Sequence, residues 1–251
     1  MNISAYLERI NYHGATTLCA ETLRALQLAH LLAVPFENLS IHAGEPIVLQ
    51  DEALFKKIVG SRRGGFCYEV NGLFAALLRA LGFDVTMLSA EVANADGVYS
   101  QPFDHMTLMV QLDERWLVDV GFGDSFLEPL LLDDTNEQPR RDDVYRIATD
   151  GGFFILLRRE MNEWKPQYRF TLQPHVYNDY AQMCHYHQTS PQSHFTQKRI
   201  CSLPTDSGRI TISDMLWIET SRVTGRLERS LESPEEYATV LRERFGIVML
   251  K

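Results

Sequence analysis

Basic residues are scarce in this chain. Its 251 residues include 24 lysines and arginines against 33 aspartates and glutamates, a net charge of −9, with no run of five basic residues. Proteins that bind the phosphate backbone of DNA or RNA present basic surfaces, so no nucleic-acid partner is expected. The chain is 45% apolar and 23% charged, which is ordinary for a globular protein. This composition excludes a disordered chain. The length of 251 residues predicts one large or two modest domains.

Long apolar runs and an extensive set of cysteines are also missing. The stretch from Val70 to Leu78 stops at Arg79, short of the roughly 20 residues that span a bilayer. Residues 1–9 lack the basic start and apolar centre of a signal peptide. We therefore expect a cytoplasmic protein with no membrane contact.

The four cysteines are Cys19, Cys67, Cys184 and Cys201. In such a chain they argue against a disulfide framework and leave packing, metal binding or catalysis.

Apolar spacing and capping signals predict three helices. The first should stop at Pro35, which cannot continue a helix. The second should begin at or just after Cys67 and end at Gly82, a typical residue after a helix C-terminus. The third should begin at Ser233, an N-cap followed by proline, and run to about Phe245. The apolar face expected on the first helix comprises Leu18, Thr22, Ala25, Ala29 and Leu32.

Beyond Phe83 the pattern becomes strand-like. Short segments rich in Val, Leu, Met and Thr alternate with polar breaks, which favours a mostly antiparallel sheet or a small barrel. The segment 178–197 is polar and rich in histidine. The expected strands are 84–92, 105–112, 116–120, 144–147, 153–158, 168–172, 209–212 and 215–219.

Residues 62–71, RRGGFCYEVN, form the most informative motif. Two glycines let the backbone turn sharply and approach a ligand closely, and Cys67 then falls at the start of the second helix. The positive end of a helix dipole and a nearby protonated histidine can lower a thiol pKa from about 8.5 to roughly 3.5–7.5. The first helical N–H groups could also stabilise an oxyanion. The alternative is that Cys67 packs only as a small buried hydrophobe.

A nucleophilic thiol needs a base within hydrogen-bond reach and a group that orients the base. His105 opens one predicted strand and Asp119 lies near the end of the next, so a hairpin could bring them together. Side-by-side placement would pair Asp119 with His105 or Met106. A two-residue turn at 113–114 would instead pair it with Leu108, roughly 10 Å from His105. The alternatives are a surface histidine and a strand-end aspartate that accepts a backbone N–H.

These motifs, in this order and spacing, resemble the arylamine N-acetyltransferases. The resemblance implies an α+β fold with a cysteine-protease-like N-terminal helical bundle (1–83), an antiparallel β-barrel (84–185) and a C-terminal α/β lid (186–251). It also implies a catalytic triad of Cys67, His105 and Asp119. The matching segments span nearly the whole chain: 35–39, 63–67, His105, 119–123, 190–195 and 245–247.

The activity implied by the resemblance is acetyl-CoA-dependent N-acetylation of arylamines, hydrazines and arylhydroxylamines. It would proceed by a ping-pong mechanism through an acetyl-cysteine, with acetyl-CoA as co-substrate and no metal, in xenobiotic metabolism. The partners would be these small molecules and coenzyme A, and the protein a monomer or homodimer. Glycines at 121 and 123 could allow coenzyme approach.

Aromatic amines are uncharged at neutral pH, so their pocket needs flat apolar walls. The candidates for these walls are Phe36, Phe66, Tyr68, Met106 and Phe122. The family resemblance points to Phe36 and Phe122 specifically. The candidates for coenzyme approach are Gly121 and Gly123.

Other functions remain open at this point. The same triad would serve a transglutaminase-like cysteine hydrolase, and an amide synthase of the same superfamily would join a carrier-bound chain to an aryl amine. A zinc-binding module is a further alternative, because Cys184, His187, His194 and Cys201 give the spacing C-x2-H-x6-H-x6-C. Arg62 and Arg63 could contact phosphate, or a buried arginine could brace the helical region.

Overall fold

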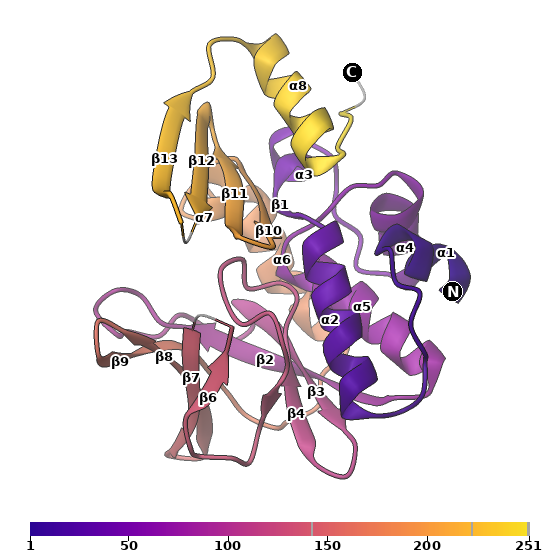
Figure 1. The fold of residues 1–251 in the computed structure, drawn as a ribbon, viewed down its shortest axis with the longest axis vertical. Coiled ribbons are helices and arrows are strands. Elements are labelled where there is room, and N and C mark those ends of the chain that lie inside the picture. The colour runs from indigo at the N-terminus through magenta and orange to yellow at the C-terminus, as the bar shows by residue number, and fades with distance from the viewer. Residues whose placement is uncertain (142, 222, 250–251) are drawn as a thin grey trace.

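The structure is a computed structural model that describes residues 1–141, 143–221 and 223–249 (Figure 1). Helices form most of its N-terminal third, an eight-stranded sheet follows, and a five-stranded sheet with a long helix completes the chain. The N-terminal helices are α1 (Ile3–Arg9), α2 (Ala20–Ala33), α3 (Leu39–His42), α4 (Asp51–Phe55), η1 (Lys56–Gly60) and α5 (Cys67–Leu81). The later helices are η2 (Tyr177–Tyr180), α6 (Ala181–Thr189), α7 (His194–Gln197) and α8 (Pro234–Phe245). Within the described ranges, no helix is long and apolar enough to cross a bilayer.

The eight-stranded sheet is antiparallel throughout and curls into a nearly closed barrel (Figure 1). The strand order is β5-β4-β3-β2-β9-β8-β7-β6, so strands close in sequence are mostly neighbours in space. Its strands are β2 (Asp84–Val92), β3 (His105–Gln111), β4 (Arg115–Val118), β5 (Leu130–Leu131), β6 (Gln138–Arg140), β7 (Asp143–Asp150), β8 (Phe153–Glu160) and β9 (Glu163–Phe170).

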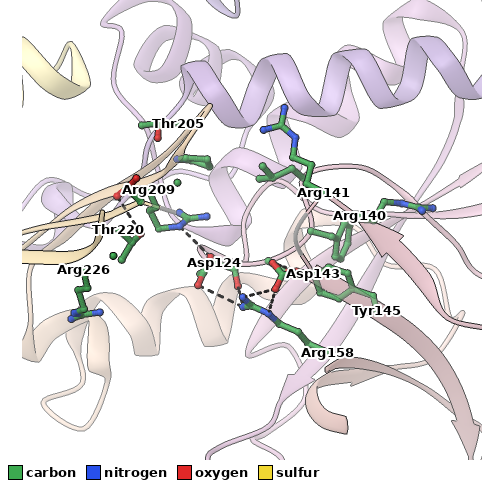
Figure 2. Close-up of a pocket in the computed structure, with 17 residues that line it drawn as sticks. Asp124, Arg140, Arg141, Asp143, Tyr145, Arg158, Thr205, Arg209, Thr220 and Arg226 are labelled. Atoms are coloured by element: carbon green, nitrogen blue, oxygen red, sulfur yellow. Dashed lines mark hydrogen bonds and ion pairs between the residues drawn. The ribbon is translucent and has the colours of Figure 1, made fainter. Parts of the chain in front are cut away.

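The five-stranded sheet joins the two ends of the chain. Strand β1 (Phe36–Glu37), from the helical N-terminal part, pairs with β10 (Ile200–Thr205), and Phe36 lies opposite Ser202. β11 (Gly208–Ser213), β12 (Leu216–Ser221) and β13 (Gly225–Ser230) complete the antiparallel order β1-β10-β11-β12-β13. Helix α8 lies beside this lid sheet, and the barrel and the lid both line one cavity (Figures 1 and 2).

The predicted α+β class, with a helical bundle, a barrel and an α/β lid, is confirmed by this arrangement. Strands β1, β5, β6, β10 and β13 were not expected from the sequence, and the polar segment 178–197 is largely taken up by three short helices, η2, α6 and α7. The division at residues 83 and 185 stays a prediction, and its second limit falls within α6.

Helix α2 buries a different face from the predicted one. Its buried side includes the polar side chains of Gln27 and His30 beside Leu23 and Leu26. Leu18 precedes the helix and is 53% exposed, so its place in the predicted apolar face is wrong. The His30 Nδ1 atom lies 2.9 Å from the Tyr6 hydroxyl. This hydrogen bond compensates for part of the cost of burying the imidazole. Hydropathy alone would not predict that this face of the helix is buried.

Helix α5 is the central element and matches its prediction. It begins at Cys67 and ends at Gly82, whose φ of 100° lies in the left-handed region that glycine adopts readily. Its residues from Cys67 to Leu78 are all buried, and the helix packs against α1, α4, β2 and β3. The first turn of α5 is therefore held between the helical part and the barrel.

Candidate active site

The turn before α5 is built by close backbone contact with β1. A Cβ added at Gly64 would lie 1.9 Å from the Pro35 carbonyl oxygen, so no larger residue fits without movement of the backbone. The Gly65 N–H donates to the same oxygen at 3.3 Å, and Glu37 N–H donates to the Gly65 oxygen at 3.0 Å. The two glycines thus allow the approach of another chain segment, where the sequence suggested approach of a ligand.

Cys67 is the first residue of α5, and only 3% of its surface is exposed. Burial raises the pKa of the Cys67 thiol well above its usual value, although a hydrogen bond from the Met106 backbone N–H opposes the shift. The nearby carboxylates of Asp104 and Asp119 raise this pKa further. The lowered pKa expected for a helix N-terminus is therefore not what the resting, buried environment produces.

His105 and Asp119 are in direct contact at the same end of the barrel. Their Nε2 and Oδ2 atoms lie 2.7 Å apart, and each residue is 3% exposed. The β3–β4 pairing ends at Leu108 opposite Val118, so one further step brings Asp119 level with Thr107. The three registers considered from the sequence, with Asp119 opposite His105, Met106 or Leu108, are therefore all wrong. His105 and Thr107 share one face of the strand, and Asp119 reaches His105 diagonally.

The hairpin loop explains this register. Gln111 pairs with Arg115, which leaves the three residues 112–114 in the turn in place of the two-residue turn considered from the sequence. The Leu112 N–H closes the loop by donating to the Glu114 oxygen at 3.0 Å. A loop one residue longer shifts the facing residue by one position.

Asp119 has three partners besides His105. Its Oδ1 atom accepts from Asn71 Nδ2 at 2.9 Å and from the Gly121 N–H at 2.8 Å, and its Oδ2 accepts from the Tyr168 hydroxyl at 3.0 Å. Burial favours a higher pKa for Asp119, but His105, Asn71 and the Gly121 N–H together lower its pKa below the usual value. The carboxyl group is therefore ionised at neutral pH and able to orient the imidazole.

Asn71 and Tyr168 are functional candidates that the sequence reasoning missed. Asn71 follows Cys67 by four residues and therefore lies on the same side of α5. Its amide also donates to the Met106 oxygen at 2.6 Å and accepts from the Val120 N–H at 2.8 Å. This four-residue spacing was the available signal for Asn71, whereas Tyr168 comes from the distant strand β9 and had none.

Replacing Asn71 with alanine should shift the pH dependence of the reaction. The pKa of Asp119 should rise because burial is then less fully opposed. If the ionised carboxylate orients His105, the acid limb of the kcat/KM profile moves to higher pH. A pH–rate profile measures this shift, and an unchanged acid limb would contradict the assigned role of Asn71.

The same variant has a stability signature with a defined sign. A lowered carboxyl pKa stabilises the fold above the unfolded pKa, and this contribution disappears as pH falls through the folded value. With the other lost hydrogen bonds, N71A should lose about 1–3 kcal/mol of unfolding free energy near neutral pH. Urea unfolding should show a smaller difference from the parent protein at about pH 3.

Packing at Gly121 joins the first turn of α5 to the segment that carries Asp119. A Cβ at Gly121 would lie 2.8 Å from the Cys67 Cα and 2.7 Å from Asn71 Nδ2. The loop after Asp119 therefore packs directly on the first turn of α5. Gly121 serves this contact, whereas Gly123, with φ of 81°, has no atom within 4 Å of an added Cβ.

The aromatic residues predicted to line a substrate pocket fall into two groups. Phe66, Tyr68 and Met106 are fully buried in the core. The Tyr68 hydroxyl donates to the backbone oxygens of residues 103 and 104, at 2.6 and 3.2 Å. Phe36 and Phe122 are only partly buried. The Phe122 ring meets the His105 ring edge to face with centroids 5.1 Å apart. Phe122 is therefore the best placed of the five to meet a substrate at His105.

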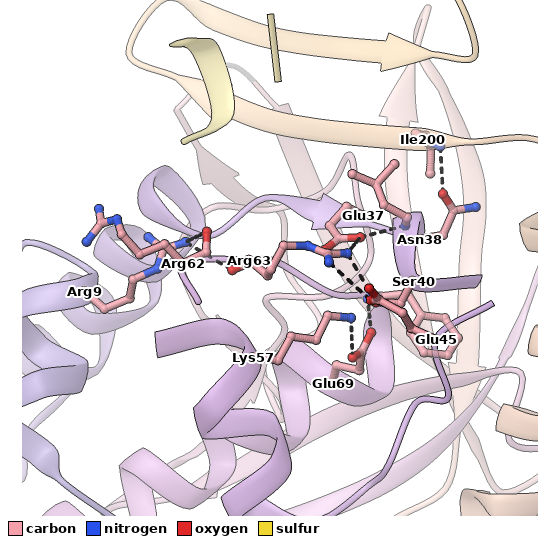
Figure 3. A network of polar contacts seen from close by, with 12 residues as sticks. Arg9, Glu37, Asn38, Ser40, Glu45, Lys57, Arg62, Arg63, Glu69 and Ile200 are labelled. Carbon is pink, nitrogen blue, oxygen red and sulfur yellow. Dashed lines mark hydrogen bonds and ion pairs between the residues drawn. The ribbon is translucent and has the colours of Figure 1, made fainter. Parts of the chain in front are cut away.

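Arg63 braces the turn before Cys67 (Figure 3). Its Nε donates to Glu37 Oε1 at 2.9 Å and one terminal nitrogen donates to Glu37 Oε2 at 3.2 Å, with both side chains buried. The Ser40 hydroxyl accepts from the same nitrogen at 3.2 Å. Arg62 is exposed and its backbone oxygen accepts from Arg9. The sequence allowed two roles for these arginines, a phosphate contact or a buried brace of the helical region. Arg63 is such a buried brace.

The histidine-rich segment does not assemble into a metal centre in the described part of the chain, where no group of three His, Cys, Asp or Glu residues could hold an ion. His187 lies between Asp104 and Ser193, with Nε2 3.2 Å from Asp104 Oδ1 and Nδ1 3.0 Å from Ser193 Oγ. Ser193 also caps α7, so this contact fastens α6 and α7 to the loop before His105. Cys184 hydrogen-bonds with Gln188 within α6.

Comparison with known proteins defines the class. Residues 20–251 match the family model described as N-acetyltransferase. Arylamine N-acetyltransferase 2 of Mus musculus is 38% identical over 230 residues, which cover 83% of this chain and 79% of the relative. The E. coli arylamine N-acetyltransferase is 33% identical and covers 98% of this chain and 88% of its own length.

Solved structures give the same result. The M. smegmatis arylamine N-acetyltransferase superposes with a TM-score of 0.91 and 34% identity, covering 98% of this chain and 92% of that chain. The Mycobacterium marinum enzyme in complex with CoA superposes with a TM-score of 0.90 and 33% identity, covering 98% and 93%. The chain belongs to the arylamine N-acetyltransferase family and is an acyltransferase.

Proposed function

We propose that the protein transfers the acetyl group of acetyl-CoA to arylamines, hydrazines and arylhydroxylamines through an acetyl-Cys67 intermediate. The observation that carries this proposal is the 2.7 Å contact between His105 and Asp119 beside the first turn of α5. Family membership supports the acyl acceptor class, and the M. marinum relative in complex with CoA supports the donor.

The first half-reaction transfers the acetyl group to the enzyme. Asp119 occupies Nε2 of His105, so Nδ1 is the nitrogen available to accept the Cys67 proton. Because burial disfavours a lone thiolate, the nucleophile forms as a thiolate–imidazolium pair. The sulfur attacks the thioester carbon, the C–S bond to coenzyme A breaks, and His105 returns the proton to the departing thiolate. Backbone N–H groups at the start of α5 would stabilise the oxyanion.

The second half-reaction regenerates the thiol. The amine nitrogen attacks the acetyl carbon, its proton passes to His105, and the C–S bond to Cys67 breaks to give an amide. The protonated His105 then returns the proton to the Cys67 sulfur. An aromatic amine is neutral at pH 7 and can pack against the exposed part of Phe122 beside His105. The low exposure of the site limits attack by water on the acetyl-enzyme.

Mixing the protein with acetyl-CoA in the absence of amine should add one acetyl group to Cys67. Intact-mass spectrometry detects the adduct, and peptide mapping identifies its position. Adding an aromatic amine should remove the group and yield the acetylated amine. A protein that stays unmodified contradicts the proposal, and an adduct that water removes as fast as amine indicates a hydrolase.

A further inference from the structure

A second imidazole–carboxylate pair lies beside the thiol site. His187 of α6 is 5% exposed, and its Nε2 atom lies 3.2 Å from Oδ1 of Asp104. Asp104 directly precedes His105 in the chain, so this pair adjoins the proposed catalytic base. Acyl transfer through His105 and Asp119 leaves the second pair without an assigned role.

The His187 ring packs against the residues on each side of the nucleophile. Its centroid lies 6.4 Å from that of Phe66 and 6.1 Å from that of Tyr68. These two residues flank Cys67 in the chain. The ring of Phe195 in α7 is also close, with its centroid 5.1 Å away. In such aromatic surroundings, which admit little water, a charge acts more strongly on its neighbours than it would in solvent.

The polar neighbours of His187 determine where its proton lies. Ser193 Oγ is 3.0 Å from Nδ1, and Asp104 faces Nε2. Burial favours a higher pKa for Asp104, but His187 and other nearby polar groups hold it below its ordinary value. An ionised carboxylate can only accept, so the facing Nε2 atom carries a proton. This atom has no well-aligned hydrogen-bond partner among the described residues, so its contact with the carboxylate is mainly electrostatic.

The Asp104 carboxylate also acts on Cys67. The Asp104 backbone oxygen accepts from the Tyr68 hydroxyl at 3.2 Å, which fixes residue 104 against the first turn of α5. Burial is the main cause that raises the pKa of the Cys67 thiol, and the Asp104 carboxylate raises this pKa more than Asp119 does. A negative charge near the sulfur opposes the thiolate, and a proton on the facing imidazole counteracts that charge.

Other titratable groups surround the pair. Burial raises the pKa of Tyr68 far above its ordinary value and that of Cys184 to about 12, so both stay neutral at physiological pH. Of the groups around Asp104, the two imidazoles can carry a positive charge, and His105 already faces Asp119. These neighbours of the pair are Cys67 and Tyr68 of α5, His105 of β3, and Cys184 and Tyr186 of α6.

We propose that His187 offsets the negative charge of Asp104 and thereby favours the reactive thiolate of Cys67. His187 is then a positioning residue, since it acts through Asp104 and not on the reacting atoms. The inference rests on the proposed function, in which the Cys67 sulfur is the nucleophile. It also gives a role to part of the histidine-rich segment, for which the sequence suggested zinc binding.

The rate of Cys67 alkylation by iodoacetamide, measured against pH, tests this effect on the thiol. Peptide mass spectrometry distinguishes Cys67 from the other cysteines. In H187L the rate at pH 7 should fall about three- to tenfold, because the charge of Asp104 is no longer offset. The isosteric variant D104N keeps His187 in place and should raise the rate above that of the parent protein. An unchanged rate in D104N would overturn the proposal, whether or not H187L folds.

The double variant H187L/D104N separates charge from packing. In the D104N background, H187L should change the alkylation rate and the kcat/KM for acetyl transfer by less than about twofold, since the charge to be offset is gone. An equal loss in both backgrounds would show that His187 acts through packing alone and would overturn the proposal.

A second histidine provides the matched control. His175 Nδ1 lies 3.2 Å from Asp179 Oδ2, and the His175 ring packs on Phe103, next to Asp104, with centroids 4.8 Å apart. H175L therefore removes an imidazole that contacts the same loop but faces a different carboxylate. It should leave the pH dependence of Cys67 alkylation unchanged, and a shift as large as that in H187L would contradict the proposal.

Alkylation does not require acetyl transfer, so the two proposals fail in different ways. A parent protein that forms no acetyl-enzyme contradicts the proposed function. A parent protein that forms acetyl-enzyme, with equal alkylation rates in the parent and in D104N, contradicts only the role of His187.

Discussion

Substitution of Cys67 by alanine should reduce acetyl transfer by at least about 10³-fold, because the group that carries the acetyl between the two half-reactions is then absent. The rest of the site should persist, since the contact of His105 with Asp119 and the contacts of Asn71 do not involve the sulfur. The measurement is the rate of amine acetylation from acetyl-CoA, together with the mass of the protein after exposure to acetyl-CoA alone.

A second buried cysteine provides the control for this experiment. Cys184 is 2% exposed and lies in α6, where its sulfur contacts Gln188. Its replacement by alanine removes the same thiol from an equally buried position and should leave the rate within a few-fold of the parent protein. If C67A retained substantial transfer activity, the covalent mechanism would be wrong whatever the result for Cys184.

Among the variants proposed here, substitution of Arg63 by alanine should lower the free energy of unfolding the most. Glu37 would then be a buried carboxylate without its guanidinium partner, and breaking a buried pair from one side costs about 3–5 kcal/mol. Urea unfolding at neutral pH measures the loss. The double variant R63L/E37L removes both charges and should recover much of the lost stability, because no unpaired charge remains.

An exposed ion pair gives the matched comparison. Lys165 and Glu163 lie 2.6 Å apart, but their side chains are 48% and 70% exposed. Replacing Lys165 with alanine should change the free energy of unfolding by less than about 1 kcal/mol. If R63A were no more destabilising than this variant, the Arg63–Glu37 contact would not be the brace of the turn before Cys67.

The parts of the fold that the sequence predicted well carry their own local signals. Helix α5 has an apolar pattern and a left-handed glycine after its last turn, and α8 begins with a serine whose hydroxyl accepts from Glu236 N–H at 3.2 Å. Strand β13 was missed because all of its residues are exposed, so no face alternates. Strand β1 has two residues and depends on a partner far away in the chain. Neither strand therefore has an alternating apolar pattern that could be recognised in the sequence.

The candidate site was predictable in its residue types and not in its geometry. Cysteine, histidine and aspartate could be chosen from their motifs, but their register depended on a loop of three residues where the sequence equally allowed two. The partners of Asp119 come from α5, β9 and the loop after β4, and only tertiary packing brings these segments together. The thiol pKa depends on burial, which a motif does not report.

The pairing of Phe36 with Ser202 has a consequence for biosynthesis. One edge of β1 meets Gly65 early in the chain, but the edge that faces β10 finds its partner only after β10 has left the ribosome, because the two strands are separated by most of the polypeptide. Nascent chains that stop before residue 200 would leave the second edge of β1 unpaired and open to chaperones and to self-association. The region that positions Cys67 therefore reaches its final form late in translation, although it is made first.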